Sequence, residues 1–319
     1  MGLIATPFAS SLFGRSHSAE RLADGVRPAM TKEALAADRS GYDAFRGAVA
    51  DFNGPARATI ARALGESPRG LDSFIRTRFP DVASGSRLLP AGFIPHAGVI
   101  LNTLERNRGR FKTADSFPVG GISPRAAPGI FIALGAVLVI AGLVALRGGG
   151  RGPVAALFVL ALVTLVVAFA LSLPHKASTT DRLLDRLSPV FSEQTARRVP
   201  GESMTVQGFV RQLEHRFLPA VERRLGKTPR ELDDLLAGSS PRLVQALPRL
   251  DGIAANFAAL GTALVNDRRF YVEAAKIPSR TLVWLLIGTS FVLLATSGPA
   301  LVAQRSRPAI DGHSDASTE

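Results

Sequence analysis

The chain contains the sequence LGESPRGLD at residues 64–72 and a close copy, LGKTPRELD, at residues 225–233. The two copies lie 161 positions apart, and the same offset aligns residues 20–75 with residues 181–236 without a gap. Thirteen of the 56 aligned pairs are identical, and many of the others are conservative replacements. Because self-similarity at a fixed offset is the mark of a repeated structural unit, we predict that the chain is a tandem duplication.

The quoted sequence predicts the end of one helix and the beginning of the next. Gly65 and Gly226 suit the left-handed conformation of the residue that follows a helix C-terminus. The Ser-Pro or Thr-Pro pair that comes next supplies a capping hydroxyl and a proline suited to the first helical position. In the second copy, Thr228 and Glu231 have the spacing of a capping box.

Apolar residues recur at spacings of three and four around this junction, which is typical of amphipathic helices. The matching series are Leu22, Val26 and Met30 with Leu183, Leu184, Leu187, Val190 and Phe191, and Phe45, Val49 and Phe52 with Val206, Phe209, Val210, Leu213 and Phe217. A longer helical stretch over residues 241–270 is expected to break near Pro248. No strand-like alternation is sustained in either copy, so the predicted fold class is all-α.

The apolar and charged residues are separated along the chain. The chain of 319 residues is 46% hydrophobic with a mean hydropathy of +0.19, yet its net charge is +12 and its pI is about 11.2. Three blocks contain no ionisable residue, at residues 129–146, 153–173 and 282–303. Since a helix of about 20 apolar residues crosses a bilayer, we predict an integral membrane protein and disfavour a soluble enzyme.

These features divide the chain into eight segments. In order they are the remnant of a membrane helix at residues 1–14, a helical soluble domain at 15–127 (repeat 1), a transmembrane helix at 128–147, a short basic loop at 148–152, a transmembrane helix at 153–174, a helical soluble domain at 175–280 (repeat 2), a transmembrane helix at 281–303 and a polar tail at 304–319. The remnant is proposed because the repeat offset aligns residues 8–15 with the end of a spanning helix. Either the chain is truncated at this point or one copy has lost its helix.

The distribution of basic residues predicts which side of the membrane the domains occupy. Two spanning helices separate the domains, so both domains must lie on the same side. Arg147, Arg151, Arg305 and Arg307 flank the short loop and the tail, which favours a cytoplasmic location for those segments. We therefore expect a multi-pass protein of a bacterial cell membrane with extracytoplasmic domains. Cytoplasmic domains that bind anionic lipid or nucleic acid are the alternative, although too few aromatic residues lie among the basic ones to favour nucleic acid.

The sequence offers few residues for catalysis or for a cofactor. There is no cysteine, and the five histidines, at 17, 96, 175, 215 and 313, show no metal-binding spacing. The glycine-rich stretch at residues 147–152 lacks the Lys-Ser/Thr of a phosphate-binding loop. We therefore predict a protein that is not an enzyme, with no catalytic residue, cofactor or metal.

Two sets of residues are candidates for interactions. Arg69 with Asp72, and Arg230 with Asp233, are repeated charged pairs at helical spacing, which an ordinary exposed ion pair would also explain. In the first spanning helix, Gly135 and Gly142 give a smooth face for helix packing.

The function predicted from this organisation is binding. Two similar domains in one chain suit a pseudo-symmetric protein partner, as in a scaffold or accessory subunit of an envelope complex. The alternative is an accessory role in the transport of a lipid or another hydrophobic ligand, held in an apolar groove between the amphipathic helices.

Overall fold

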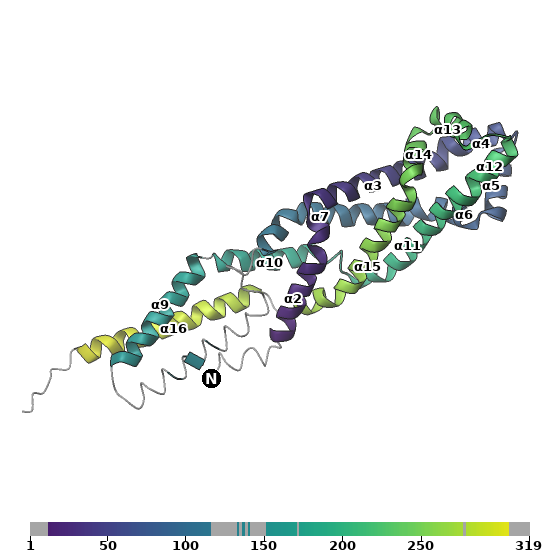
Figure 1. Ribbon diagram of the computed structural model, residues 1–319. Helices are drawn as coiled ribbons and strands as arrows, with labels where there is room; N and C mark the ends of the chain where they lie inside the picture. Colours follow the sequence, from purple (N-terminus) through teal and green to yellow (C-terminus); the bar gives the residue numbers. More distant parts are fainter. Residues whose placement is uncertain are drawn as a thin grey trace, which may run out of the picture. The chain divides into compact units, whose positions relative to one another are not determined.

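The computed structural model describes residues 12–115, 133, 136–137, 140, 151–170, 172–276 and 279–305. In these ranges every regular element is a helix and no strand is present, which confirms the all-α prediction (Figure 1). Most of the predicted tail at 304–319 and most of the predicted helix at 128–147 lie outside the described residues, as does most of the predicted remnant at 1–14.

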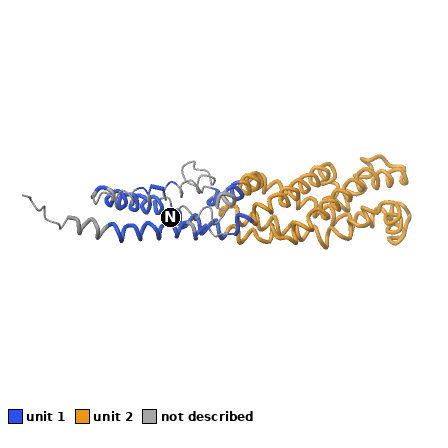
Figure 2. Tube along the Cα trace, turned by 90° about the horizontal axis from the view of Figure 1, so that it is seen from below, with its two compact units in different colours: residues 1–20, 113–182, 273–319 blue, residues 21–112, 183–272 orange. Residues whose placement is uncertain are grey.

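The chain forms two compact units, each assembled from separated stretches of sequence (Figure 2). Unit 1 comprises residues 1–20, 113–182 and 273–319, and unit 2 comprises residues 21–112 and 183–272. Each predicted soluble domain gives most of its residues to unit 2. The two predicted domains therefore share one unit.

The helices of the first half have counterparts in the same order in the second half, and from α2 to α4 the bounds match within one residue after a shift of 161 positions. The first series is α2 (Leu12–Val26), α3 (Lys32–Asp51), η2 (Phe52–Ala56), α4 (Arg57–Ala63), α5 (Pro68–Arg78), α6 (Pro80–Leu88), η3 (Leu89–Phe93) and α7 (Ile94–Asp115). The second series is α10 (Leu173–Leu187), α11 (Glu193–Gln212), η5 (Leu213–Phe217), α12 (Leu218–Leu225), α13 (Pro229–Ala237), α14 (Pro241–Ala246), η6 (Leu247–Arg249) and α15 (Leu250–Ala275). A short 3-10 helix, η1 (Pro28–Met30), lies between α2 and α3.

The helix junctions are those that the quoted sequence predicts. Gly65 and Gly226 both have positive φ, +67° and +62°. Gly226 follows α12 directly, and Gly65 comes one residue after Leu64, the C-cap of α4. The Ser67 hydroxyl accepts from the backbone N–H of Gly70 at the start of α5. At the start of α13, Thr228 and Glu231 form the complete capping box. The predicted break near Pro248 is also present, as η6 between α14 and α15.

Two predicted helices are shorter than the apolar spacing indicated. α2 ends at Val26 and α10 ends at Leu187, so that Met30 and Phe191 lie beyond them, although both side chains are buried. Proline cannot donate the backbone hydrogen bond that would continue an α-helix. Pro28 and Pro189, which are equivalent in the two copies, follow the two helix ends.

Three π-helical turns, which the sequence analysis did not predict, lie in unit 2. η2 contains Pro55, η3 contains Pro90, and η5 ends two residues before Pro219. Because proline lacks an N–H, the normal i to i−4 bonding is interrupted beside each of these turns. η2 and η5 are equivalent in the two halves.

The two halves of unit 2 are interlocked around a single core. α3 packs against α14 of the other half, and α11 packs in the equivalent way against α6. The ring of Phe52 makes edge contacts with Phe209 and Phe217, with ring centroids 5.6 and 5.7 Å apart. All three rings are at most 1% exposed. Burying a phenylalanine stabilises a fold by about 2 kcal/mol, so the halves stabilise each other.

In unit 1, α9 (Arg151–Ala170) packs against α16 (Ser279–Arg305). α9 begins and ends earlier than the predicted span at 153–174, and Ser172, with φ of 53°, marks the bend into α10. By length and composition, the stretch Pro241–Ser297 contains one helix sufficient to cross a membrane. The pair Val154–Ala170 and Leu173–Leu187, bent by 52°, would give a second if it counts as one span.

Candidate functional site

The most distinctive polar site in unit 2 is a helix cap supplied by the other half of the chain. Asp51, at the end of α3, is 2% exposed. Its Oδ2 accepts from the backbone N–H groups of Arg242 and Leu243, at 2.9 and 3.3 Å, in the first turn of α14. Its Oδ1 accepts from Nε and Nη2 of Arg242 at 3.0 and 2.6 Å. The carboxylate thus satisfies donors that α14 leaves free at its N-terminus.

The equivalent site joins the halves in the opposite direction. Gln212, 161 positions after Asp51, is 4% exposed at the end of α11. Its Oε1 accepts from the backbone N–H groups of Asp81 and Val82, at 2.7 and 3.0 Å, in the first turn of α6. Neither α6 nor α14 has a side-chain cap from its own flanking residue. Each half therefore caps a helix of the other half.

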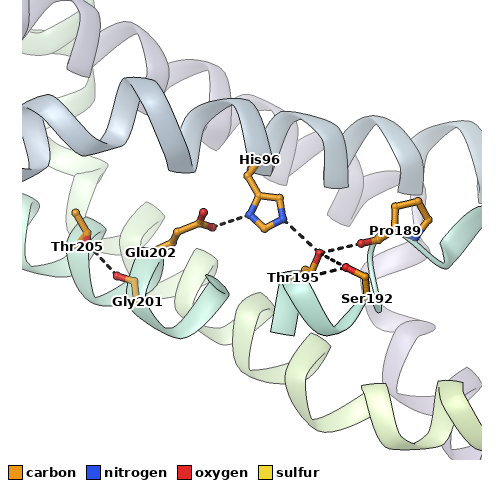
Figure 3. A network of polar contacts seen from close by, with 7 residues as sticks. All are labelled: His96, Pro189, Ser192, Thr195, Gly201, Glu202 and Thr205. Carbon is orange, nitrogen blue, oxygen red and sulfur yellow. Dashed lines mark hydrogen bonds and ion pairs between the residues drawn. The ribbon is translucent and has the colours of Figure 1, made fainter. Parts of the chain in front are cut away.

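A third polar site connects α7 with α11 (Figure 3). Nδ1 of His96 lies 2.7 Å from Oε2 of Glu202, and Nε2 lies 3.4 Å from the Thr195 hydroxyl oxygen. Thr195 donates its proton to the Pro189 carbonyl at 2.8 Å and accepts from the Ser192 hydroxyl at 3.0 Å. These contacts are all satisfied when both imidazole nitrogens carry a proton.

The order of hydroxyl, imidazole and carboxylate in this site is similar to that of a nucleophilic triad, but its geometry does not activate the hydroxyl. Thr195 is 5% exposed, and its proton points to a carbonyl instead of to the imidazole. An activated nucleophile needs its proton directed at the base and access for a substrate. We interpret the site as a contact between the halves.

The structure does not bring the predicted charged pairs together as pairs. Asp72 binds Arg57 of α4 at 3.1 Å, and Arg69 is exposed. Burial lowers the pKa of Arg57, and the Asp72 carboxylate opposes that shift. No ion pair between Arg230 and Asp233 is found within the described parts of the chain, and burial raises the pKa of Asp233, with repulsion from the neighbouring Asp234 adding to the rise. All four candidates remain at the helix junctions.

The predicted packing face of the first spanning helix lies outside the described residues. Gly135 and Gly142 both belong to the part of the chain that the structure does not describe. Their role in helix packing therefore stays a prediction.

One further cluster of polar residues lies where η5 approaches α15. Glu214, His215 and Asp251 each offer one nitrogen or oxygen atom that could bind a metal ion, and these three atoms lie within 4.8 Å of one another. Nε2 of His215 is 3.3 Å from Oδ2 of Asp251. Burial raises the pKa of Glu214 to about 7, the Asp251 carboxylate adds to the rise, and His215 opposes it. Together the residues offer one imidazole and two carboxylates.

Sequence spacing gave no indication of these sites because each joins residues that are distant in the chain. Asp51 and Arg242 are 191 positions apart, and Gln212 and Val82 are 130 apart. The repeat held a usable signal, since the offset places Asp51 opposite Gln212. The repeat does not show, however, that each of these side chains contacts a helix of the other half, because that depends on how the halves interlock.

Comparison of the chain with protein-family models, with curated proteins and with solved structures finds no match.

Proposed function

We propose that the protein is a multi-pass membrane protein, and the exposed apolar faces of α9 and α16 carry this proposal. The two helices share a small buried core that includes Ala168, Val283 and Ile287. Large apolar side chains on the remaining faces are exposed, among them Val159, Val163, Val166, Phe169, Trp284, Phe291 and Val292. Soluble proteins rarely expose apolar surface in such quantity, whereas lipid covers it without cost.

The polar side chains of these helices also fit a membrane environment. The hydroxyls of Thr164, Thr289, Ser290, Thr296 and Ser297 each donate to the carbonyl four residues earlier in the same helix. Hydroxyls bonded in this way leave no unpaired donor to face lipid. Residues 153–173 and 282–303 contain no ionisable side chain.

We further propose that unit 2 arose by tandem duplication. The matched helix bounds support this origin, and so do the two cross-half caps. Asp51 and Gln212 occupy equivalent positions and bind equivalent backbone groups, at residues 242–243 and 81–82. Two copies related in this way are expected of a fused homodimer, because an isologous interface uses each contact twice.

The function that fits this arrangement best is non-enzymatic binding of a protein partner at the bacterial cell envelope, as a scaffold or an accessory subunit. The core that both halves share supports a location of both on one side of the membrane. The basic residues that flank the short loop and the tail favour a cytoplasmic location for those two segments, and therefore an extracytoplasmic location for unit 2. The alternative role in lipid transport needs an open apolar groove between the helices. In unit 2, aromatic rings instead pack against one another in the interior.

Cysteine labelling tests the membrane arrangement. The natural chain has no cysteine, so one introduced thiol gives an unambiguous signal. Gly54 and Gly238 are exposed and have open space at the Cβ position, which makes them suitable sites in unit 2. We expect a membrane-impermeant maleimide to label Gly54→Cys and Gly238→Cys in intact cells, and to label Gly149→Cys only after permeabilisation. The reverse pattern would contradict the proposed orientation.

Charge reversal tests the binding function. The complex would be purified in mild detergent and its mass measured with and without the paired change Arg69→Glu and Arg230→Glu. Arg106→Glu with Arg198→Glu is the matched control, because these arginines are also exposed and the total charge changes equally. Loss of a stoichiometric protein from the first variant alone supports the proposal. A lone chain in every sample, or a chain that carries only lipid, would contradict it.

A further inference from the structure

The cluster of Glu214, His215 and Asp251 has the composition of a metal site. Its donor atoms come from two elements, η5 and the first turn of α15, and lie within 4.8 Å of one another. Imidazole nitrogen and carboxylate oxygen are common ligands of zinc and related divalent ions. Ligands at about 2 Å from a tetrahedral ion lie about 3.3 Å apart, so small side-chain rotations would bring all three into range.

The two carboxylates lack a strong cationic partner. Within the described residues, no lysine or arginine forms an ion pair with Glu214 or Asp251, and His215 alone pairs with Asp251. Oε1 of Glu214 is buried and has no hydrogen-bond partner. A buried, unpaired carboxylate oxygen is costly, and a bound cation removes that cost.

The equivalent position in the first half cannot form the same cluster. Asn53 and Gly54 replace Glu214 and His215 in the matching π turn. Nδ2 of Asn53 donates to the Ser86 carbonyl at 2.7 Å, which ties that turn to α6 by a direct hydrogen bond. The cluster is therefore specific to the second half, and one site per chain is expected.

We propose that Glu214, His215 and Asp251 bind one divalent transition-metal ion of the zinc class. Imidazole nitrogen and one oxygen from each carboxylate supply three ligands, and water completes the tetrahedron. The ion ties η5 to the start of α15. Because His215 and Asp251 are each 61% exposed, the ion exchanges with solution and chelators remove it.

Metal titration of the full-length protein in detergent tests this proposal. After removal of metal with a chelator, Zn²⁺ binding is measured by competition with a chromophoric chelator, and Co²⁺ binding by its visible absorption. The expected result is one ion per chain, with the absorption of a tetrahedral Co²⁺ complex. His215→Ala and, separately, Asp251→Asn should each weaken binding at least tenfold.

His175→Ala is the matched control, because His175 is also exposed and is not part of the cluster. This variant should retain the wild-type affinity. Circular dichroism verifies that each variant is folded. We expect folding to be retained because the substituted side chains are exposed. The proposal is overturned if wild-type protein binds no Zn²⁺, or if His215→Ala and Asp251→Asn both bind it as the wild type does.

Discussion

The two halves of unit 2 use the same positions for their mutual helix caps but use different chemistry. In one cap, the Asp51 carboxylate binds two backbone N–H groups and the side chain of Arg242. In the other, the neutral Gln212 amide binds two backbone N–H groups beside Asp81. Because Asp81 occupies the position equivalent to Arg242, a carboxylate at position 212 would be repelled. The comparison indicates that the capping position requires a side-chain acceptor oxygen. Whether that side chain is charged depends on the charge of the residue that it faces.

Removal of the charged cap should have the largest effect. Asp51→Ala leaves buried N–H groups of α14 without an acceptor, so we expect a loss of about 3 kcal/mol in the free energy of unfolding. Asp51→Asn keeps an acceptor oxygen and should lose about 1 kcal/mol. Denaturant unfolding in detergent, followed by circular dichroism, measures both. Asp43→Ala, an exposed change in the same helix, serves as control.

A charge introduced into the neutral cap should have the next largest effect. Gln212→Glu places a carboxylate beside Asp81 and should cost about 2 kcal/mol. Adding Asp81→Arg recreates the chemistry of the other cap and should recover most of that loss. The same unfolding measurement applies to both variants. If the double variant is no more stable than Gln212→Glu alone, the two caps are not equivalent.

The pH dependence of stability should differ between the equivalent turns, because Glu214 stands where the first half has Asn53. The folded-state pKa of Glu214, about 7, lies above its ordinary value of 4.5, so the folded protein binds more protons in this interval. Stability therefore falls as pH rises from 4.5 to 7, by about 1 kcal/mol after allowance for solvent screening. Glu214→Gln should remove this decrease, measured with a chelator present. An unchanged pH profile would contradict the assignment to Glu214.

The smallest effect is expected at the glycines that precede the two caps. A Cβ at Gly208 would lie 3.5 Å from Asp81, an ordinary contact, whereas one at Gly47 would lie 3.1 Å from Arg242. Alanine is favoured over glycine inside a helix by about 1 kcal/mol. Gly208→Ala should therefore stabilise the protein by up to about 1 kcal/mol, whereas at Gly47 the contact should cancel the gain. Thermal unfolding of the two variants side by side measures the difference.

Local features of the fold could be predicted from the sequence, because neighbouring residues determine them. Examples are the glycines at the ends of α4 and α12, the capping box of Thr228 and the all-helical pattern. Each depends on residues within one or two helical turns. The ends of α2 and α10 were misjudged because apolar spacing was followed past Pro28 and Pro189. The π turns were missed because a proline in a helix permits several local geometries.

The polar sites could not be predicted in the same way, because they depend on how the halves interlock. Repetition alone places Asp51 and Gln212 at equivalent positions but does not say what either side chain contacts. His96 pairs with Glu202 only because α7 approaches α11, which no local sequence pattern predicts. Glu214 and His215 are adjacent in sequence, yet the cluster forms only when Asp251 joins them.

The cap exchange has a consequence for synthesis of the chain on the ribosome. α3 is complete once Asp51 has emerged, but its backbone partner at Leu243 is 192 residues further along. At about 5 to 20 residues per second, translation of that interval takes roughly 10 to 40 seconds. The nascent first half must wait for its counterpart during this time with its apolar surface uncovered. The cell must therefore protect the unpaired half from aggregation and proteolysis until the second half arrives.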